Sequence, residues 1–181
     1  RRDAFCGKLS VCNNFYQYGI KFTDTTLHTC KIQSDLFEKD VHRFAGICRV
    51  VKGLSGARIG AIGARPAAFQ TMRASEKILQ ASGITVIPVD MSEILGNAHK
   101  VKDDDPAVKQ KLEEIHAYGK IPSRIPSQNV IRQAKFGIAS ETWINENEID
   151  AAAFQCWTSI QENFGCATCL TMSMLGEKLM P

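Results

Sequence analysis

Three short runs of small and β-branched residues, separated by helical patterns, limit the folds that this chain can adopt. The runs are residues 58–63, 84–89 and 151–157, and the first reads Arg-Ile-Gly-Ala-Ile-Gly. Between them, apolar residues recur at three- and four-residue steps, as they do along one face of a helix. Strands that are joined through helices pair in parallel with right-handed crossovers. The sequence therefore predicts a doubly wound, Rossmann-like α/β fold, in which helices cover both faces of a three-layer parallel arrangement.

Capping residues and breakers give the expected bounds of the helices. The second helix begins at Ser34, a good N-cap, and ends near Gly53, and Phe44 and Cys48 lie on its apolar face. Pro66 suits the first turn of another helix, which closes at Gly83. The remaining expected elements are helices at 5–18, after Pro106, at 127–137 and at 140–147, and a short strand at 20–23.

A chain of 181 residues has the length of one domain, so we expect residues 1–181 to form a single domain. No internal repeat or low-complexity tract interrupts it. The last residues before Pro181 form a helix-like stretch with no closing strand after it. This abrupt end favours a domain of a longer multidomain chain that is truncated after Pro181.

Charge and hydropathy exclude several classes of protein. The net charge is only +3, and lysine and arginine are scattered among acidic residues, so a nucleic-acid partner is not expected. No apolar run approaches the roughly 18 residues that a membrane span needs. The segment from Arg1 to Phe5 lacks the apolar core of a secretory signal. We therefore expect a cytoplasmic protein without a membrane partner.

The cysteines and histidines give weak evidence for a metal or redox site. Seven cysteines, an odd number, fit reduced thiols in a cytoplasmic protein. Cys166 and Cys169 form a C-x-x-C pair, but a zinc site would need two more ligands at a suitable spacing. The four histidines lie far apart in the sequence. We expect no metal ligand within this chain, with a redox or metal role for the C-x-x-C pair as the alternative.

A dinucleotide site is a second possibility, at the first strand. Gly56, Gly60 and Gly63 lie along it, and Asp90 follows the next strand, where an acid that binds ribose would stand. However, the G-x-G-x-x-G fingerprint is absent, and Gly60 and Gly63 fall within the strand and at its end. Close packing of helices on the strand explains these glycines equally well. A nicotinamide-binding oxidoreductase domain stays open as an alternative.

Two further positions are candidates for ligand contact. Arg65 follows the first strand and precedes a helix start, at the edge of the sheet where ligands of open α/β folds bind. Gln155 and Trp157 follow the third buried run. A glutamine amide both donates and accepts hydrogen bonds, and tryptophan offers a flat apolar face, so the pair suits a polyhydroxylated ligand such as a sugar. A capped strand end with a core tryptophan is the structural alternative.

Three stretches of the chain resemble the L-fucose isomerase-like family of sugar isomerases. They are residues 5–20, residues 51–69 and residues 153–175, the last containing Ala-Phe-Gln-Cys-Trp-Thr-Ser-Ile. The third stretch is the most specific, and the similarity runs over essentially all 181 residues. By this resemblance the chain corresponds to the middle domain of such an enzyme.

The resemblance implies an aldose–ketose isomerase that forms a homo-oligomer and uses a divalent metal, usually Mn²⁺. In that family the metal assists an enediol mechanism, and its ligands are a Glu, an Asp and a His, which are expected beyond Pro181. Gln155 matches a substrate-contacting glutamine, and Trp157 lies within the same motif. No catalytic residue falls within the chain, so the 181 residues alone are expected to be inactive. A non-catalytic sugar-binding or assembly domain is the competing interpretation.

Overall fold

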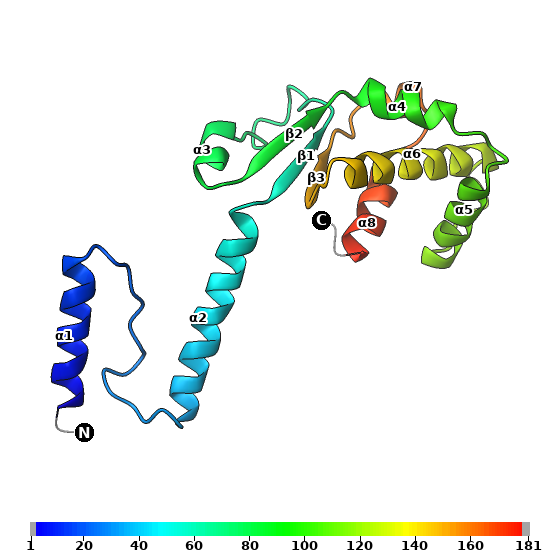
Figure 1. Cartoon of the computed structure of the whole chain (residues 1–181). Coiled ribbons are helices and arrows are strands. Elements are labelled where there is room, and N and C mark those ends of the chain that lie inside the picture. Colours follow the sequence, from blue (N-terminus) through cyan, green and yellow to red (C-terminus); the bar gives the residue numbers. More distant parts are fainter. Residues whose placement is uncertain (1–2, 179–181) are drawn as a thin grey trace. The chain divides into compact units, whose positions relative to one another are not determined.

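The computed structural model describes residues 3–178 and divides into two compact units, Arg1–Leu54 and Ser55–Pro181 (Figure 1). The single domain predicted from the sequence stays a prediction, and each compact unit is described by itself. The two units differ in their cores, because the buried apolar side chains of the described residues begin at Ala57. The second unit thus has a hydrophobic core of its own, and the first has none.

The first unit consists of two helices and the segment that joins them. They are α1 (Ala4–Gln17) and α2 (Asp35–Leu54), and neither contains a buried residue. Ser34 caps α2 as predicted, since its hydroxyl accepts a hydrogen bond from the Phe37 N–H at 3.4 Å. The strand predicted at 20–23 is wrong. Phe22 instead packs its ring against Phe15 of α1, with 5.9 Å between ring centroids.

The second unit is built on a three-stranded parallel sheet with helices around it, which confirms the predicted α/β class. Its strands are β1 (Arg58–Ile62), β2 (Thr85–Val89) and β3 (Ala151–Phe154), in the order β2-β1-β3. Gly60 in the central strand lies opposite Ile87 on one side and Ala152 on the other. Pro88 lies in the edge strand β2, as its missing N–H requires.

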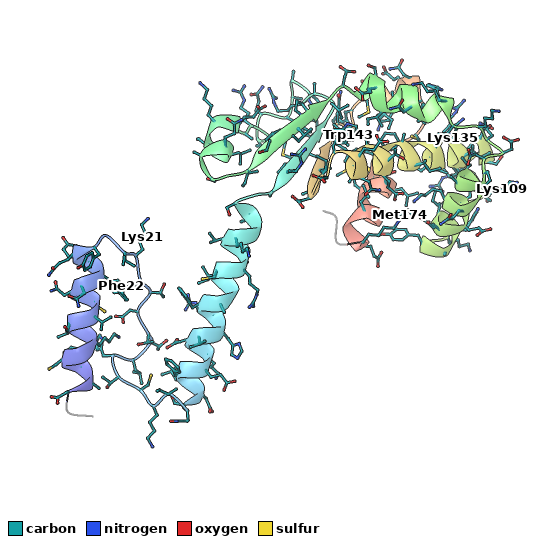
Figure 2. All side chains as sticks on the ribbon, in the orientation of Figure 1. Lys21, Phe22, Lys109, Lys135, Trp143 and Met174 are labelled. Atoms are coloured by element: carbon teal, nitrogen blue, oxygen red, sulfur yellow. The ribbon has the colours of Figure 1, made fainter. Side chains whose placement is uncertain are left out.

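The main core lies between the sheet and α6 (Ser127–Glu146). Sequence patterns predicted two helices over this range, but small buried residues at Ala139 and Ser140 let one helix run through. Trp143 of α6, labelled in Figure 2, packs closely over β1. A Cβ on Gly60 would lie 2.9 Å from the Trp143 ring, so glycine is required there.

The other helices of this unit are α3 (Glu76–Ala81), α4 (Met91–Lys100), α5 (Pro106–Tyr118), α7 (Ser159–Asn163) and α8 (Cys169–Glu177). The helix predicted to run from Pro66 to Gly83 is confirmed only in its second half, as α3, because residues 66–72 form turns and irregular loop. The Arg65 guanidinium holds these turns together. It donates to the carbonyl oxygens of Pro66 and Phe69 at 3.0 and 3.1 Å.

A buried lysine links three helices in a second core region. Lys111 of α5 donates to Glu114 and to Glu141 of α6, both at 2.7 Å, and only 8% of its side chain is exposed. Lys178, just after α8, also pairs with Glu141. Glu141, whose side chain is 24% exposed, therefore lies in an ion-pair network with two lysines. Among residues 3–178, no helix is long and apolar enough to cross a membrane.

Replacing Gly83 with alanine is expected to lower the free energy of unfolding by about 1–3 kcal/mol. Gly83 has a φ of +83°, and a Cβ there would lie 2.6 Å from the backbone oxygen of Ser55. Gly176 in α8 is the matched control, because a Cβ there meets nothing within 4 Å. Urea denaturation of both alanine variants tests this, and an unchanged midpoint for Gly83→Ala would refute the close contact.

Candidate functional site

A cavity of about 460 Å³ lies at the carboxyl ends of the three parallel strands. Gly63 follows β1, Asp90 follows β2 and Gln155 follows β3, and all three line it. Ligands of open α/β sheets bind at this edge. The complete lining is Gly63, Ala64, Asp90, Met91, Ser92, Leu95, Gly96, His99, Gln155, Ser159 and Asn163.

The amide of Gln155 is fixed at this edge by two hydrogen bonds. Its Oε1 accepts from the Ala64 N–H at 2.8 Å, and its Nε2 donates to the Trp157 carbonyl at 3.2 Å. A primary amide has two donor hydrogens and two acceptor lone pairs, so one of each remains for a ligand. An amide held in this way can bind a hydroxyl group either as donor or as acceptor.

Gly63 makes this placement of Gln155 possible. Its φ is +82°, and a Cβ at this position would lie 2.5 Å from Oε1 of Gln155. The Trp143 ring packs against Gly60 in the same way that the Gln155 side chain packs against Gly63. Close packing therefore explains why glycine stands at both positions. The Ala64 N–H, which a pyrophosphate would need, already binds Gln155. The geometry therefore favours the packing interpretation over a dinucleotide site.

The structure places the other two predicted contact residues outside the cavity lining. Trp157 is 54% exposed, and its ring meets the ring of Phe69 edge-on, with 5.2 Å between centroids. Arg65 is exposed and folds back on the turn that follows it. Of the three candidates, the structure brings only Gln155 into the cavity, and the roles of Arg65 and Trp157 stay predictions.

Four polar side chains of the cavity were missed by sequence reasoning: Ser92, His99, Ser159 and Asn163. His99 lies in the last turn of α4, where its ring packs edge-on against Phe164 at 4.8 Å. Asn163 donates to the Ser159 carbonyl at 2.9 Å. Their only sequence signal was position, since each lies on a helix that follows the carboxyl end of a strand.

Asp90 has a structural role that differs from the ribose contact considered above. It is the N-cap of α4, and its Oδ1 accepts from the Ser92 N–H at 2.7 Å. Hydrogen bonds from the side chain and the backbone of Ser92 lower the pKa of Asp90. The carboxylate is therefore ionised at neutral pH and lies at the cavity wall.

The described residues offer no ready metal centre. Within residues 3–178, no three His, Cys, Asp or Glu side chains lie close enough together to hold a metal ion. The C-x-x-C pair is also unlike a redox site. Cys169 is exposed, whereas burial raises the pKa of Cys166 to about 12, which disfavours its thiolate.

Alkylation of Cys166 is expected to be at least about a hundredfold slower in the native chain than in the urea-unfolded chain. The reason is the small thiolate fraction that a pKa of about 12 leaves at pH 8. Iodoacetamide labelling followed by peptide mass spectrometry measures it, with exposed Cys169 as the internal control. Equal labelling rates for Cys166 in both states would contradict the burial.

A larger cavity, of about 650 Å³, lies away from the strand ends. Apolar side chains form most of it, among them Ile121, Ile125 and Leu170. Asn129, Gln133 and Gln161 also line it, but its surface is mainly apolar, whereas polar groups make up a larger share of the cavity at the strand ends. The cavity at the strand ends is therefore the better candidate for a site that binds a polar ligand.

Comparison with known proteins identifies the relatives of the chain. Residues 1–55 match the family described as Fucose/sulfoquinovose isomerase, N-terminal domain. The resemblance to the L-fucose isomerase-like family is thereby confirmed. The sulfoquinovose isomerases of Priestia aryabhattai and Priestia megaterium are each 26% identical to the chain over 136 residues. The alignment covers 75% of this chain and 30% of each relative, so the chain spans about a third of their length.

The family match also bears on the domain organisation of the chain. Its end at residue 55 coincides with the boundary between the two structural units, Leu54 and Ser55. The first unit thus coincides with the region that is similar to the N-terminal-domain family. For the second unit, with its sheet and cavity, the assignment to a middle domain stays a prediction.

Proposed function

We propose that this chain is part of a sugar isomerase that interconverts an aldose and a ketose. The observation that carries the proposal is the fixed amide of Gln155 in the cavity at the strand ends. Gln155 is the residue that the family resemblance marks as a substrate contact. The similarity of the chain to sulfoquinovose isomerases supports the reaction class.

In the proposed enzyme, the second unit binds and orients the sugar. The free N–H and lone pair of Gln155 hold a sugar hydroxyl, and Ser159 and Asn163 offer further polar contacts. Holding the substrate in one orientation lowers the entropic part of the barrier for a reaction at a neighbouring centre. The chain also contributes contacts between subunits of a homo-oligomer, and a cytoplasmic location is part of the proposal.

A divalent metal, Mn²⁺ or a similar ion, belongs to the proposed full-length enzyme. When bound, it would act as a Lewis acid toward the sugar oxygens. The described residues do not fit such an ion, because they gather no three suitable ligands. We place the ligands of the metal outside this chain. The 181-residue chain alone is accordingly proposed to be inactive.

Saturation-transfer NMR on the 181-residue chain tests the proposal. We expect weak binding of L-fucose or L-arabinose that does not change when Mn²⁺ is replaced by EDTA, with no ketose formed. Formation of ketose by this chain would overturn the proposed inactivity. Absence of any sugar binding would overturn the role of the cavity. If the chain binds sugar without metal and the full-length protein also forms no ketose, the competing interpretation, a non-catalytic sugar-binding domain, would be supported.

A titration with NADH tests the remaining alternative, a nicotinamide-binding oxidoreductase. Both tryptophans, Trp143 and Trp157, lie in the second unit, so binding at the strand ends should quench their fluorescence. We expect no quenching beyond the inner-filter effect, because Gln155 occupies the donor that a pyrophosphate would use. Saturable quenching would favour the oxidoreductase.

A further inference from the structure

The charges around the cavity at the strand ends are unbalanced. Asp90 supplies a carboxylate, and none of the described lining residues is a lysine or an arginine. His99 is the only other titratable side chain in the lining. A negative group without a cationic partner repels anions that enter the same cavity. The electrostatics of this cavity therefore distinguish neutral ligands from anionic ones.

Two backbone donors that could have bound an anion are already occupied. The N-terminus of α4 would ordinarily attract an anion, but Asp90 accepts the Ser92 N–H at 2.7 Å. At the neighbouring strand, the Ala64 N–H is bound to Gln155 at 2.8 Å. These two donors are therefore no longer open to a sulfonate or a phosphate.

A neutral hydroxyl meets a different environment. The second oxygen of Asp90 accepts hydrogen bonds, and the Gln155 amide keeps one donor and one acceptor. A sugar hydroxyl can donate a hydrogen bond to the Asp90 carboxylate. With the Gln155 amide it can act either as donor or as acceptor. The same carboxylate that repels an anion therefore stabilises a bound polyol.

From these contacts we propose that Asp90 is a specificity-determining residue, which makes the cavity select uncharged sugars and exclude sugars that carry an anionic group. The inference rests on the proposed sugar site and adds the class of substrate. It also separates this chain from its relatives, whose names contain sulfoquinovose, a sugar that bears a sulfonate.

The test is an NMR titration of the 181-residue chain with three sugars: L-fucose, quinovose and sulfoquinovose. Quinovose is the same sugar as sulfoquinovose without the sulfonate, so the pair isolates the effect of the charge. The readouts are the backbone amides of Gly63 and Ser92 and the side-chain amide of Gln155, all in the cavity lining. We expect sulfoquinovose to bind at least about threefold more weakly than quinovose.

Asp90→Asn removes the charge and keeps an N-cap residue of equal quality. We expect it to shift the ratio of the two affinities about three- to fivefold in favour of sulfoquinovose, because only the binding of the sulfonate gains from loss of the charge. Asp105→Asn is the matched control, because Asp105 caps α5 through the Ala107 N–H at 2.8 Å and does not line the cavity. The control should change neither affinity.

The outcomes separate this inference from the proposed function. Neutral sugars that bind, combined with equal affinities for quinovose and sulfoquinovose, would overturn the inference alone. So would a difference that persists unchanged in Asp90→Asn, because another group would then cause it. If no sugar shifts the three reporter amides, the proposed sugar site fails, and the inference fails with it.

Discussion

Replacing Phe136 with alanine is expected to lower the free energy of unfolding of the second unit by about 3–5 kcal/mol. Phe136 lies on the inner face of α6, is fully buried, and packs its ring against Phe154 of β3 at 6.1 Å. Truncation would leave a cavity between the helix and the sheet. Because whole domains are stable by only about 5–15 kcal/mol, the loss would be a large share of the total.

Urea denaturation followed by circular dichroism measures the loss. Phe136→Leu keeps most of the side-chain volume, so it should lower the free energy of unfolding clearly less than Phe136→Ala does. It provides a folded comparison if the alanine variant is unfolded. Ile78→Ala is the surface control, since Ile78 is 69% exposed, and its expected effect is below about 0.5 kcal/mol. Equal effects for Phe136→Ala and Ile78→Ala would contradict the assigned core.

Replacing Gln155 with alanine in the full-length protein is expected to lower kcat/KM for the sugar about 10- to 100-fold. The substitution removes the donor and the acceptor that the cavity offers to the substrate. It also releases the Ala64 N–H and the Trp157 carbonyl, which lie in exposed loops where water replaces the lost partner. The loss should therefore appear in sugar binding and turnover more than in stability.

The metal content of the variant distinguishes a sugar-binding role of Gln155 from a metal-binding role. We expect the Gln155→Ala protein to keep the metal content of the unmodified protein. Gln128→Ala is the matched control, because Gln128 binds Asp103 on the exposed side of α6, away from the cavity. Loss of metal together with activity, in a folded variant, would mean that the role assigned to Gln155 is wrong.

The local part of the fold could be predicted from the sequence. Residues 58–62 and 85–89 form strands because small and β-branched residues in short runs fit a buried sheet. Pro88 has no backbone N–H to donate to a neighbouring strand, and the strand that contains it lies at the edge of the sheet. The helices after Ser34 and Asp105 likewise begin at their capping residues.

The predictions that were wrong concerned structure that depends on specific contacts, and the spacing of apolar residues does not reveal such contacts. In the turns after Pro66, the carbonyl groups of Pro66 and Phe69 accept hydrogen bonds both from the Arg65 guanidinium and from backbone N–H groups three residues on. The apolar stripe of α2 predicted a buried face, yet Phe44 is 50% exposed in a unit that has no buried side chain in its helices. Periodicity shows which face is apolar, but not whether the chain itself covers it.

The candidate site was predicted only in part, for the same reason. Gln155 could be singled out because a polar amide directly after a buried strand needs hydrogen-bond partners. Its actual partner at Ala64 is 91 positions away in the sequence, and the contact depends on Gly63 lacking a Cβ. The contributions of Ser92, His99 and Asn163 follow from how the helices pack beside the strands, which the sequence alone does not determine.

Turnover by the full-length polypeptide that contains this sequence in its source organism is the most direct measurement of the central claim. The purified protein would be loaded with Mn²⁺ and incubated separately with L-fucose, L-arabinose and sulfoquinovose, and the ketose products quantified. We predict that it converts a neutral aldose to its ketose. A folded, metal-loaded protein that converts none of the three would contradict the assignment to a sugar isomerase.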